Sequence, residues 1–220
     1  MNLTEIIYIA FAYLLGAIPT GYLITRATMH KNILEIGWRK TSGSNVFKNV
    51  GKWQGIVTAV LDVLKGFSAV GLARFFGFSD SVQVFAGLSA LVGNNWSVFI
   101  KFSGGRGLAV LAGAIMVFSW KLFIVALMPV IISALIWTAS IGTFIAFGAV
   151  IFFSFYFHSF STAGIFMIVS LVPIFLKRLS PIKELTFKRK DVIWNRLIFD
   201  DDVPNREWRI KKIVEKLKKH

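Results

Sequence analysis

The feature that most constrains this chain is a stretch of 55 residues, 122 to 176, that contains no Lys, Arg, Asp or Glu. His158 is the only histidine in this stretch. One bilayer span needs about 20 mostly apolar residues in a helix, so the stretch holds two long or three short spans. We therefore expect an all-α fold, a polytopic bundle of transmembrane helices.

The composition of the whole chain agrees with this expectation. Of 220 residues, 55% are hydrophobic and 22 are Phe, and the mean hydropathy is +0.67, values far from those of a soluble domain. No Lys or Arg precedes the first apolar stretch, so that stretch reads as a span and not as a cleaved signal peptide. The absence of Cys excludes a disulfide framework and a thiolate metal site.

The hydropathy pattern contains about seven candidate spans. They cover residues 4–25, 55–77, 82–100, 107–120, 122–138, 141–157 and 160–176. Five spans is the alternative, because 107–120 is short and the region 107–157 then includes re-entrant segments.

The distribution of positive charge predicts the orientation. The segment 26–53 carries six Lys and Arg against one Glu, and residues 177–220 carry fourteen Lys and Arg against seven Asp and Glu. By the positive-inside rule both segments are cytoplasmic, which places the N-terminus outside and the C-terminus inside. A multi-pass protein of the bacterial inner membrane is the expected localisation.

Residues 1–176 then form the membrane domain, and residues 177–220 form a basic cytoplasmic tail. Its end, REWRIKKIVEKLKKH, has the periodicity of an amphipathic helix on an anionic lipid surface. A solvated tail that only fixes the orientation is an equal alternative. Because membrane orientation explains much of the net charge of +14, we predict no nucleic-acid partner.

Two of three predicted cytoplasmic clusters offer small polar groups. RKTSGSNVFKNVGK combines the donors of Ser44 and Asn45 with the cation of Lys48, and WTASIG places Ser140 at the mouth of a span. Hydroxyl and amide groups beside cations suit an anionic headgroup.

The third cluster, KFSGGRGLAV, is the stronger candidate for a phosphate site. Gly104, Gly105 and Gly107 allow backbone N–H groups to approach a ligand, and a helix is expected directly after them. The positive end of that helix and the Arg106 guanidinium add to the same anion site.

Asp62 and Lys65 are ionisable residues inside a predicted span, three positions apart on one helix face. They form either a neutralised structural pair or the border of a polar substrate cavity. We predict no metal site and no cofactor, because His30, His158 and His220 are isolated and the aspartates at 200–202 read as a solvated loop.

In order and spacing, these segments resemble the bacterial acyl-phosphate:glycerol-3-phosphate acyltransferases. LLGAIPTGYLITR is similar to their opening signature, and SNVFKNVGKWQGI followed by LDVLKG is similar to Thr-Asn-Val-x-Arg, Gly and Asp-x-x-Lys-Gly. VGNNWSVFIKFSGGRGLAV is similar to Gly-His-x-x-Pro-Val-Phe-x-x-Phe-x-Gly-Gly-Lys-Gly-Val-Ala-Thr. The likeness covers residues 14–113.

The resemblance implies acyl transfer from an acyl phosphate to the 1-hydroxyl of glycerol 3-phosphate, giving lysophosphatidic acid and inorganic phosphate. By position it implies catalytic roles for Ser44, Asn45, Lys48, Arg106 and Asn94, of which Arg106 takes the place of a lysine and Asn94 that of a histidine. It implies substrate binding by Gly104, Gly105, Gly107, Asp62, Lys65, Ser140 and Arg196.

The implied partners are the acyl phosphate, glycerol 3-phosphate and anionic membrane lipids; the oligomeric state stays open. Two alternatives remain from the residues themselves. One is a relative that binds a phosphorylated lipid precursor without transfer or with altered substrates. The other is a small lipid or anion transporter, for which an internal repeat is the expected sign.

Overall fold

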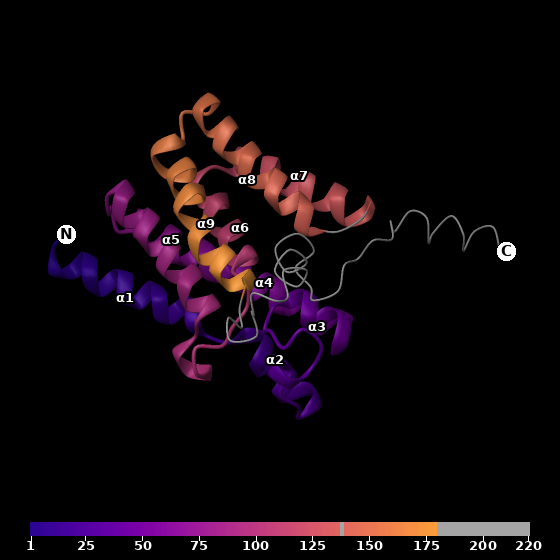
Figure 1. Ribbon diagram of the computed structural model, residues 1–220. Coiled ribbons are helices and arrows are strands. Elements are labelled where there is room, and N and C mark those ends of the chain that lie inside the picture. Colours follow the sequence, from indigo (N-terminus) through magenta and orange to yellow (C-terminus); the bar gives the residue numbers. More distant parts are fainter. Residues whose placement is uncertain (137–138, 180–220) are drawn as a thin grey trace, which may run out of the picture.

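The computed structural model describes residues 1–136 and 139–179, and the regular secondary structure of this part of the chain is helical apart from one isolated bridge between Ser97 and Ser103 (Figure 1). Its elements are α1 (Leu3–Ala17), α2 (Thr20–Met29), η1 (Ile33–Glu35), α3 (Gly43–Asn49), α4 (Lys52–Phe75), α5 (Asp80–Asn95), η2 (Val98–Ile100), α6 (Leu108–Phe118), α7 (Trp120–Ile136), α8 (Ala139–Tyr156), η3 (Phe160–Gly164) and α9 (Ile165–Leu179). The predicted tail, with Arg196, lies almost wholly outside the described residues.

The helices form a bundle in which α1 packs on α5, α4 on α6, and α7 on α8 as a hairpin, while α9 contacts α5 and α8 (Figure 1). Glycines allow these helices to touch backbone to backbone. A Cβ at Gly66 would lie 1.9 Å from the Val110 carbonyl oxygen, and one at Gly113 would lie 1.9 Å from that of Val63. Small residues at such crossings are typical of helix pairs in membranes.

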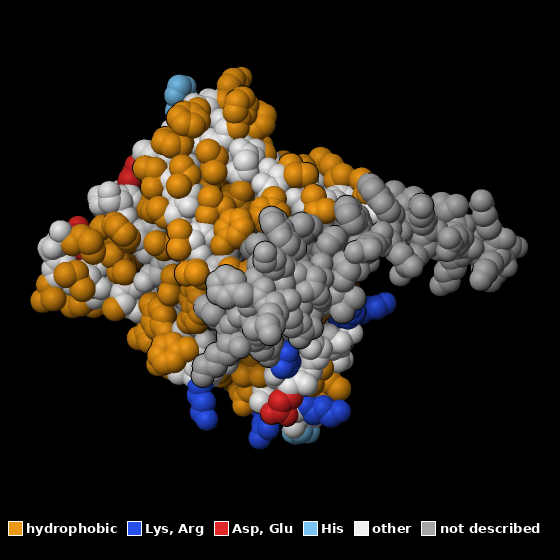
Figure 2. Space-filling model, viewed as in Figure 1, with side chains coloured by type: hydrophobic (Ala, Val, Ile, Leu, Met, Phe, Trp, Pro, Cys, Tyr) orange, Lys and Arg blue, Asp and Glu red, His pale blue; other side chains and the backbone are white. Residues whose placement is uncertain are grey.

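The described helices have the apolar character of membrane spans. Leu3–Met29, Lys52–Phe75 and Phe160–Leu179 are long and apolar enough to cross a bilayer, and shorter apolar helices accompany them. Hydrophobic side chains cover most of the face in Figure 2, whereas Lys and Arg gather at its lower end, over α2 and α3. The predicted multi-pass, all-helical architecture is confirmed.

The first predicted span, 4–25, is not one continuous helix. α1 ends at Ala17 and α2 begins at Thr20, with Pro19 at the junction. Proline lacks the N–H that a continuous helix needs, so the chain bends there. The predicted span 82–100 also ends early, because α5 stops at Asn95 and the chain turns through η2.

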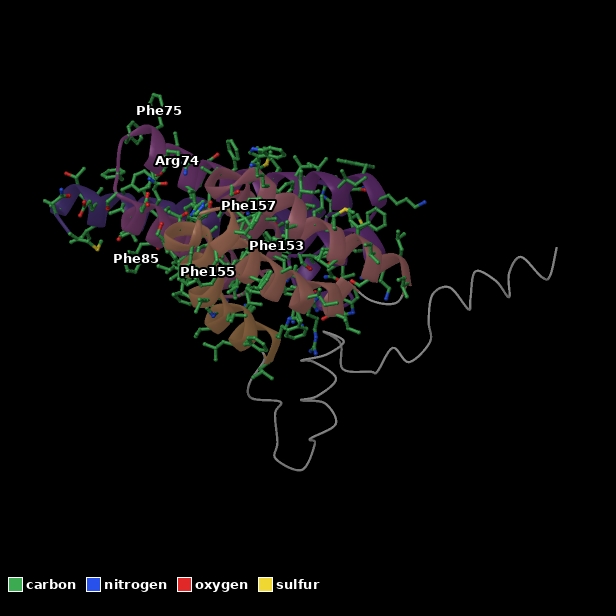
Figure 3. All side chains as sticks on the ribbon, turned by 90° about the horizontal axis from the view of Figure 1, so that it is seen from above. Arg74, Phe75, Phe85, Phe153, Phe155 and Phe157 are labelled. Atoms are coloured by element: carbon green, nitrogen blue, oxygen red, sulfur yellow. The ribbon has the colours of Figure 1, made fainter. Side chains whose placement is uncertain are left out.

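Aromatic side chains mark the end of the bundle opposite the α1–α2 break. Phe75 is 81% exposed at the end of α4, and Phe155 is exposed near the end of α8 (Figure 3). Beside Phe75, Arg74 donates through Nη1 to the Val117 carbonyl oxygen at 2.6 Å. Aromatic rings at span ends are typical of the bilayer interface.

Candidate active site

Residues 101–107, here called the glycine loop, join η2 to α6. The loop is closed by the Ser97 N–H, which donates to the Ser103 carbonyl at 2.9 Å, and by the Gly105 N–H, which donates to the Asn94 carbonyl at 2.9 Å. A Cβ at Gly104 would lie 2.3 Å from the Asn94 carbonyl oxygen, and Gly107 has φ +74°. Only glycine fits these two positions, so the loop keeps its backbone against the end of α5.

Asn45 organises the other loop of the site, residues 36–49. It is fully buried, and its Nδ2 donates to the carbonyls of Ile36 (3.1 Å) and Lys40 (2.8 Å). Its Oδ1 accepts from the Trp38 N–H at 3.0 Å and from Asn49 at 2.9 Å. The amide is thereby saturated, which favours a positioning role over the substrate contact predicted from the sequence.

The two loops meet. The Thr41 N–H approaches the Gly104 carbonyl at 3.4 Å. Two cations lie over the indole of Trp38, with Lys48 Nζ 5.0 Å and Arg106 Cζ 5.4 Å from the ring centroid. Cation–π contact thus holds two positive charges from distant segments beside the glycine loop.

Ser44 and Asn94 occupy different environments at this junction. Ser44 is exposed at the start of α3, with its Oγ 3.3 Å from Ser42 Oγ. Asn94 is only 7% exposed, and its Nδ2 would lie 3.0 Å from a Cβ at Gly105. In the part of the chain that the structure describes, the Asn94 amide makes no hydrogen bond. A buried amide with unused capacity beside N–H groups suits a ligand contact.

α9 brings a further cation to the same end of the bundle. Arg178 is 2% exposed, and its Nη1 donates to Ser140 Oγ at 3.0 Å while its Cζ lies 4.6 Å from the Phe144 ring centroid. Asn95 Nδ2, which donates to the Pro173 carbonyl at 3.4 Å, ties α9 to the end of α5. Sequence reasoning identified Ser140 but missed Arg178, because it explained basic residues after the last span by orientation.

Asp62 and Lys65 hold the break in the first span. Lys65 Nζ lies 2.7 Å from Asp62 Oδ1, 2.6 Å from the Ile18 carbonyl and 3.1 Å from Thr20 Oγ1. Thr20 Oγ1 in turn donates to Asp62 Oδ1 at 2.6 Å. All three ammonium donors are used inside the protein. This geometry favours the structural alternative for the pair over substrate binding.

Fold and site together define a class: a polytopic helical membrane protein in which a glycine loop, a helix N-terminus and clustered cations lie together at one end of the bundle. Groups of this kind are typical of anion sites.

The family model for glycerol-3-phosphate acyltransferases matches residues 6–188. The chain belongs to this family. It is 33% identical over 215 residues to glycerol-3-phosphate acyltransferase 5 of Dehalococcoides mccartyi, covering 94% of this chain and 92% of that one. It is 32% identical over 219 residues to glycerol-3-phosphate acyltransferase 4 from another strain of that species, covering 94% and 93%.

A solved structure of PlsY (YgiH), an integral membrane glycerol 3-phosphate acyltransferase in its glycerol 3-phosphate form, superposes with a TM-score of 0.73. Sequence identity is 26%, with 84% of this chain and 94% of that chain covered. The lysophosphatidic acid form of PlsY gives a TM-score of 0.70. The predicted family and the acyltransferase class are confirmed.

Proposed function

We propose that the protein transfers an acyl group from an acyl phosphate to the 1-hydroxyl of glycerol 3-phosphate, with lysophosphatidic acid and inorganic phosphate as products. The observation that carries this is the junction of the two loops, where Arg106 and Lys48 lie over one indole beside the glycine loop. Both substrates carry phosphate, and such a junction screens two anions at once.

The reaction needs alignment more than activation. The hydroxyl oxygen attacks the acyl carbonyl, a new ester C–O bond forms, and the bond from the carbonyl carbon to the phosphate oxygen breaks with the electron pair leaving on phosphate. The hydroxyl proton passes to a phosphate oxygen, so the protein supplies no general base. Positioned N–H groups and cations stabilise the charge that develops on the carbonyl oxygen and the leaving group.

Each polar group of the site has a distinct part in this proposal. Arg106 and the N–H groups at the start of α6 bind a substrate phosphate, and Lys48 is the second cation of that pocket. Asn94 donates to the reacting ligand, and Ser44 contributes a hydroxyl at the exposed rim. Ser140, held by Arg178, binds the other substrate from the side of α8.

Orientation follows from the charge distribution. We propose about seven spans, with the glycine loop and the loop of residues 36–49 on the cytoplasmic side and the N-terminus outside. The helices α5 to α8, η3 with α9, α4 and the broken α1–α2 supply these spans. Anionic lipids of the cytoplasmic leaflet are the proposed partners of the basic tail.

Purified protein in lipid vesicles tests the reaction with palmitoyl phosphate and glycerol 3-phosphate. We expect inorganic phosphate and lysophosphatidic acid to appear in equal amounts, and palmitoyl-CoA not to replace the donor. An intact family member serves as the positive control. If that control turns over and this protein releases no phosphate, the proposal fails.

One observation favours a second candidate, a relative that binds without transfer: Asn94 stands where the family signature has histidine. Such a protein would bind glycerol 3-phosphate in a titration but give no phosphate in the same vesicles.

A further inference from the structure

Lys177 lies in the last turn of α9 and is buried, with 4% of its surface exposed. Within the part of the chain that the structure describes, its ammonium forms no hydrogen bond and no ion pair. Its Nζ lies 5.4 Å from the centroid of the Trp96 ring. An unpaired charge inside a membrane bundle is costly, so this position calls for a ligand of opposite charge.

The two other Lys and Arg side chains that are buried in the described residues have protein partners. Lys65 donates to Asp62 Oδ1 at 2.7 Å and to two further oxygens. Arg178 donates to Ser140 Oγ at 3.0 Å. Lys177 therefore differs from both, because its three N–H donors stay unused inside the described fold.

Asn95 connects the region of Lys177 to the glycine loop. Its Nδ2 donates to the Pro173 carbonyl of α9 at 3.4 Å, and its Oδ1 would lie 2.8 Å from a Cβ at Gly107. Lys177 follows Pro173 by four residues, about one turn or 6 Å along the helix. Trp96, over which the ammonium lies, comes directly after Asn95. The end of α9 therefore lies at the same end of the bundle as the glycine loop (Figure 1).

The end of α9 contacts two neighbouring helices through its two cations. Successive residues of a helix lie about 100° apart around its axis, so Lys177 and Arg178 face different neighbours. Lys177 lies over Trp96 at the end of α5, whereas Arg178 Cζ lies 4.6 Å from the ring centroid of Phe144 on α8. The cations thus flank the side of the site where Ser140 begins α8.

The cations near the glycine loop fall into two groups, each beside its own indole. Lys48 and Arg106 lie over Trp38, and Lys177 lies over Trp96. The proposed reaction brings two phosphates together, one on glycerol and one on the acyl donor. Two separate groups of cations suit two anions that must approach each other, because each group screens its own ligand.

We propose that Lys177 binds the phosphate of the acyl donor and still holds it when it leaves as inorganic phosphate. The inference rests on the proposed function, in which Ser140 and Arg178 serve the substrate that the glycine loop does not bind. When the bond from the carbonyl carbon to the phosphate oxygen breaks, the electron pair stays on the phosphate and its negative charge grows. An ammonium with three unused donors stabilises that charge.

Melting temperatures with ligands test this inference without turnover. Saturating glycerol 3-phosphate should raise the melting temperature of the wild type, and inorganic phosphate added to that complex should raise it again, because a second anion binds. Lys177→Met keeps an apolar stem and removes the charge, so it should show the first increase and lose most of the second. Lys52→Met, at the exposed first residue of α4, is the matched control and should show both.

Phosphate release gives a second reading of the same variants. Lys177→Met should lower kcat/KM for palmitoyl phosphate by about tenfold or more and leave the KM for glycerol 3-phosphate within about twofold. Lys177→Arg should recover part of the loss, because the charge returns. Without ligands the melting temperature of Lys177→Met should stay close to that of the wild type, since no hydrogen bond of the described fold is lost.

The outcomes separate the inference from the function beneath it. No phosphate release by the wild type contradicts the proposed function, whereas the second increase still tests phosphate binding by Lys177. A wild type without a second increase, or an equal one in Lys177→Met, overturns the inference. Loss of the first increase alone overturns it too, because the lysine then binds glycerol 3-phosphate.

A purely structural role for Lys177 predicts a different result. Lys177→Met would then melt at a lower temperature without ligands and show both increases, and this pattern also overturns the inference. Lys177→Gln replaces Lys177→Met if that variant does not fold, and the same losses are required of it.

Discussion

Asn45 and Asn94 are both buried amides at the junction of the two loops, but their side chains meet different surroundings. The Asn45 amide forms hydrogen bonds with the backbone of residues 36–40 and with Asn49. These bonds fix the loop that carries Trp38 and Lys48. Asn94 anchors the glycine loop through its carbonyl and keeps its side-chain amide for another partner. Asn45 is therefore a positioning residue, and Asn94 is the proposed ligand contact.

Asn94→Ala should lower kcat/KM for glycerol 3-phosphate by about tenfold, while the melting temperature stays close to that of the wild type. The reason is that the substitution removes a ligand contact and no hydrogen bond of the described fold. Steady-state phosphate release and a thermal melt check it. Asn94→His, which restores the family's residue, should retain more activity than Asn94→Ala; equal rates for all three proteins would contradict the assignment.

Asn45→Ala should instead destabilise the protein, by about 2 kcal/mol or more, because it removes the buried hydrogen bonds from the Trp38 N–H and to the carbonyls of Ile36 and Lys40. The melting temperature and the rate of proteolysis between residues 36 and 49 report this loss. Ser44→Ala, an exposed change on the neighbouring residue, is the control for stability. A variant with unchanged melting and proteolysis would show that Asn45 does not organise the loop.

At the scale of elements, the break between α1 and α2 depends on one polar cluster. Pro19 interrupts the helix. Lys65, on α4, donates to the Ile18 carbonyl, and the Asp62 carboxylate neutralises the charge of the Lys65 ammonium. The cluster sits in a lipid-facing bundle where an unpaired charge is costly. It fixes the direction of α2 relative to α4, and with it the position of the loop that follows α2.

Lys65→Met alone should therefore cost about 3 to 5 kcal/mol of stability, because it leaves the buried Asp62 carboxylate unpaired. The double variant Asp62→Leu, Lys65→Met should lose less than Lys65→Met alone, since no uncompensated charge remains. Denaturation in detergent across the double-mutant cycle measures the coupling. Additive losses would contradict a direct pair.

Prediction from sequence succeeded for elements and failed for the pairs between them. Hydropathy located the apolar helices, and glycine spacing located the loop before α6, because both are local properties. The bend at Pro19 was missed since a hydropathy window averages across one proline. The contacts of Arg178 with Ser140, and of Trp38 with Lys48 and Arg106, join residues far apart in the chain, and no local pattern encodes them.

At the scale of the whole molecule, the proposed orientation is open to a direct test, because the chain contains no Cys. Phe102, 61% exposed in the glycine loop, and Asp80, exposed at the start of α5, lie at opposite ends of the bundle. In intact cells an impermeant maleimide should label Asp80→Cys, and Phe102→Cys should be labelled only after the membrane is opened. The reverse pattern would invert the topology.

Phosphate release by Arg106→Ala tests most directly the proposed binding of a substrate phosphate by Arg106 at the glycine loop. We expect kcat/KM to fall by at least about tenfold, a loss of about 1.4 kcal/mol of transition-state stabilisation, with partial recovery in Arg106→Lys because the charge returns. Lys121→Ala, which removes a cation beside Phe157 at the opposite end of the bundle, should match the wild type. Wild-type rates in Arg106→Ala would contradict the central claim.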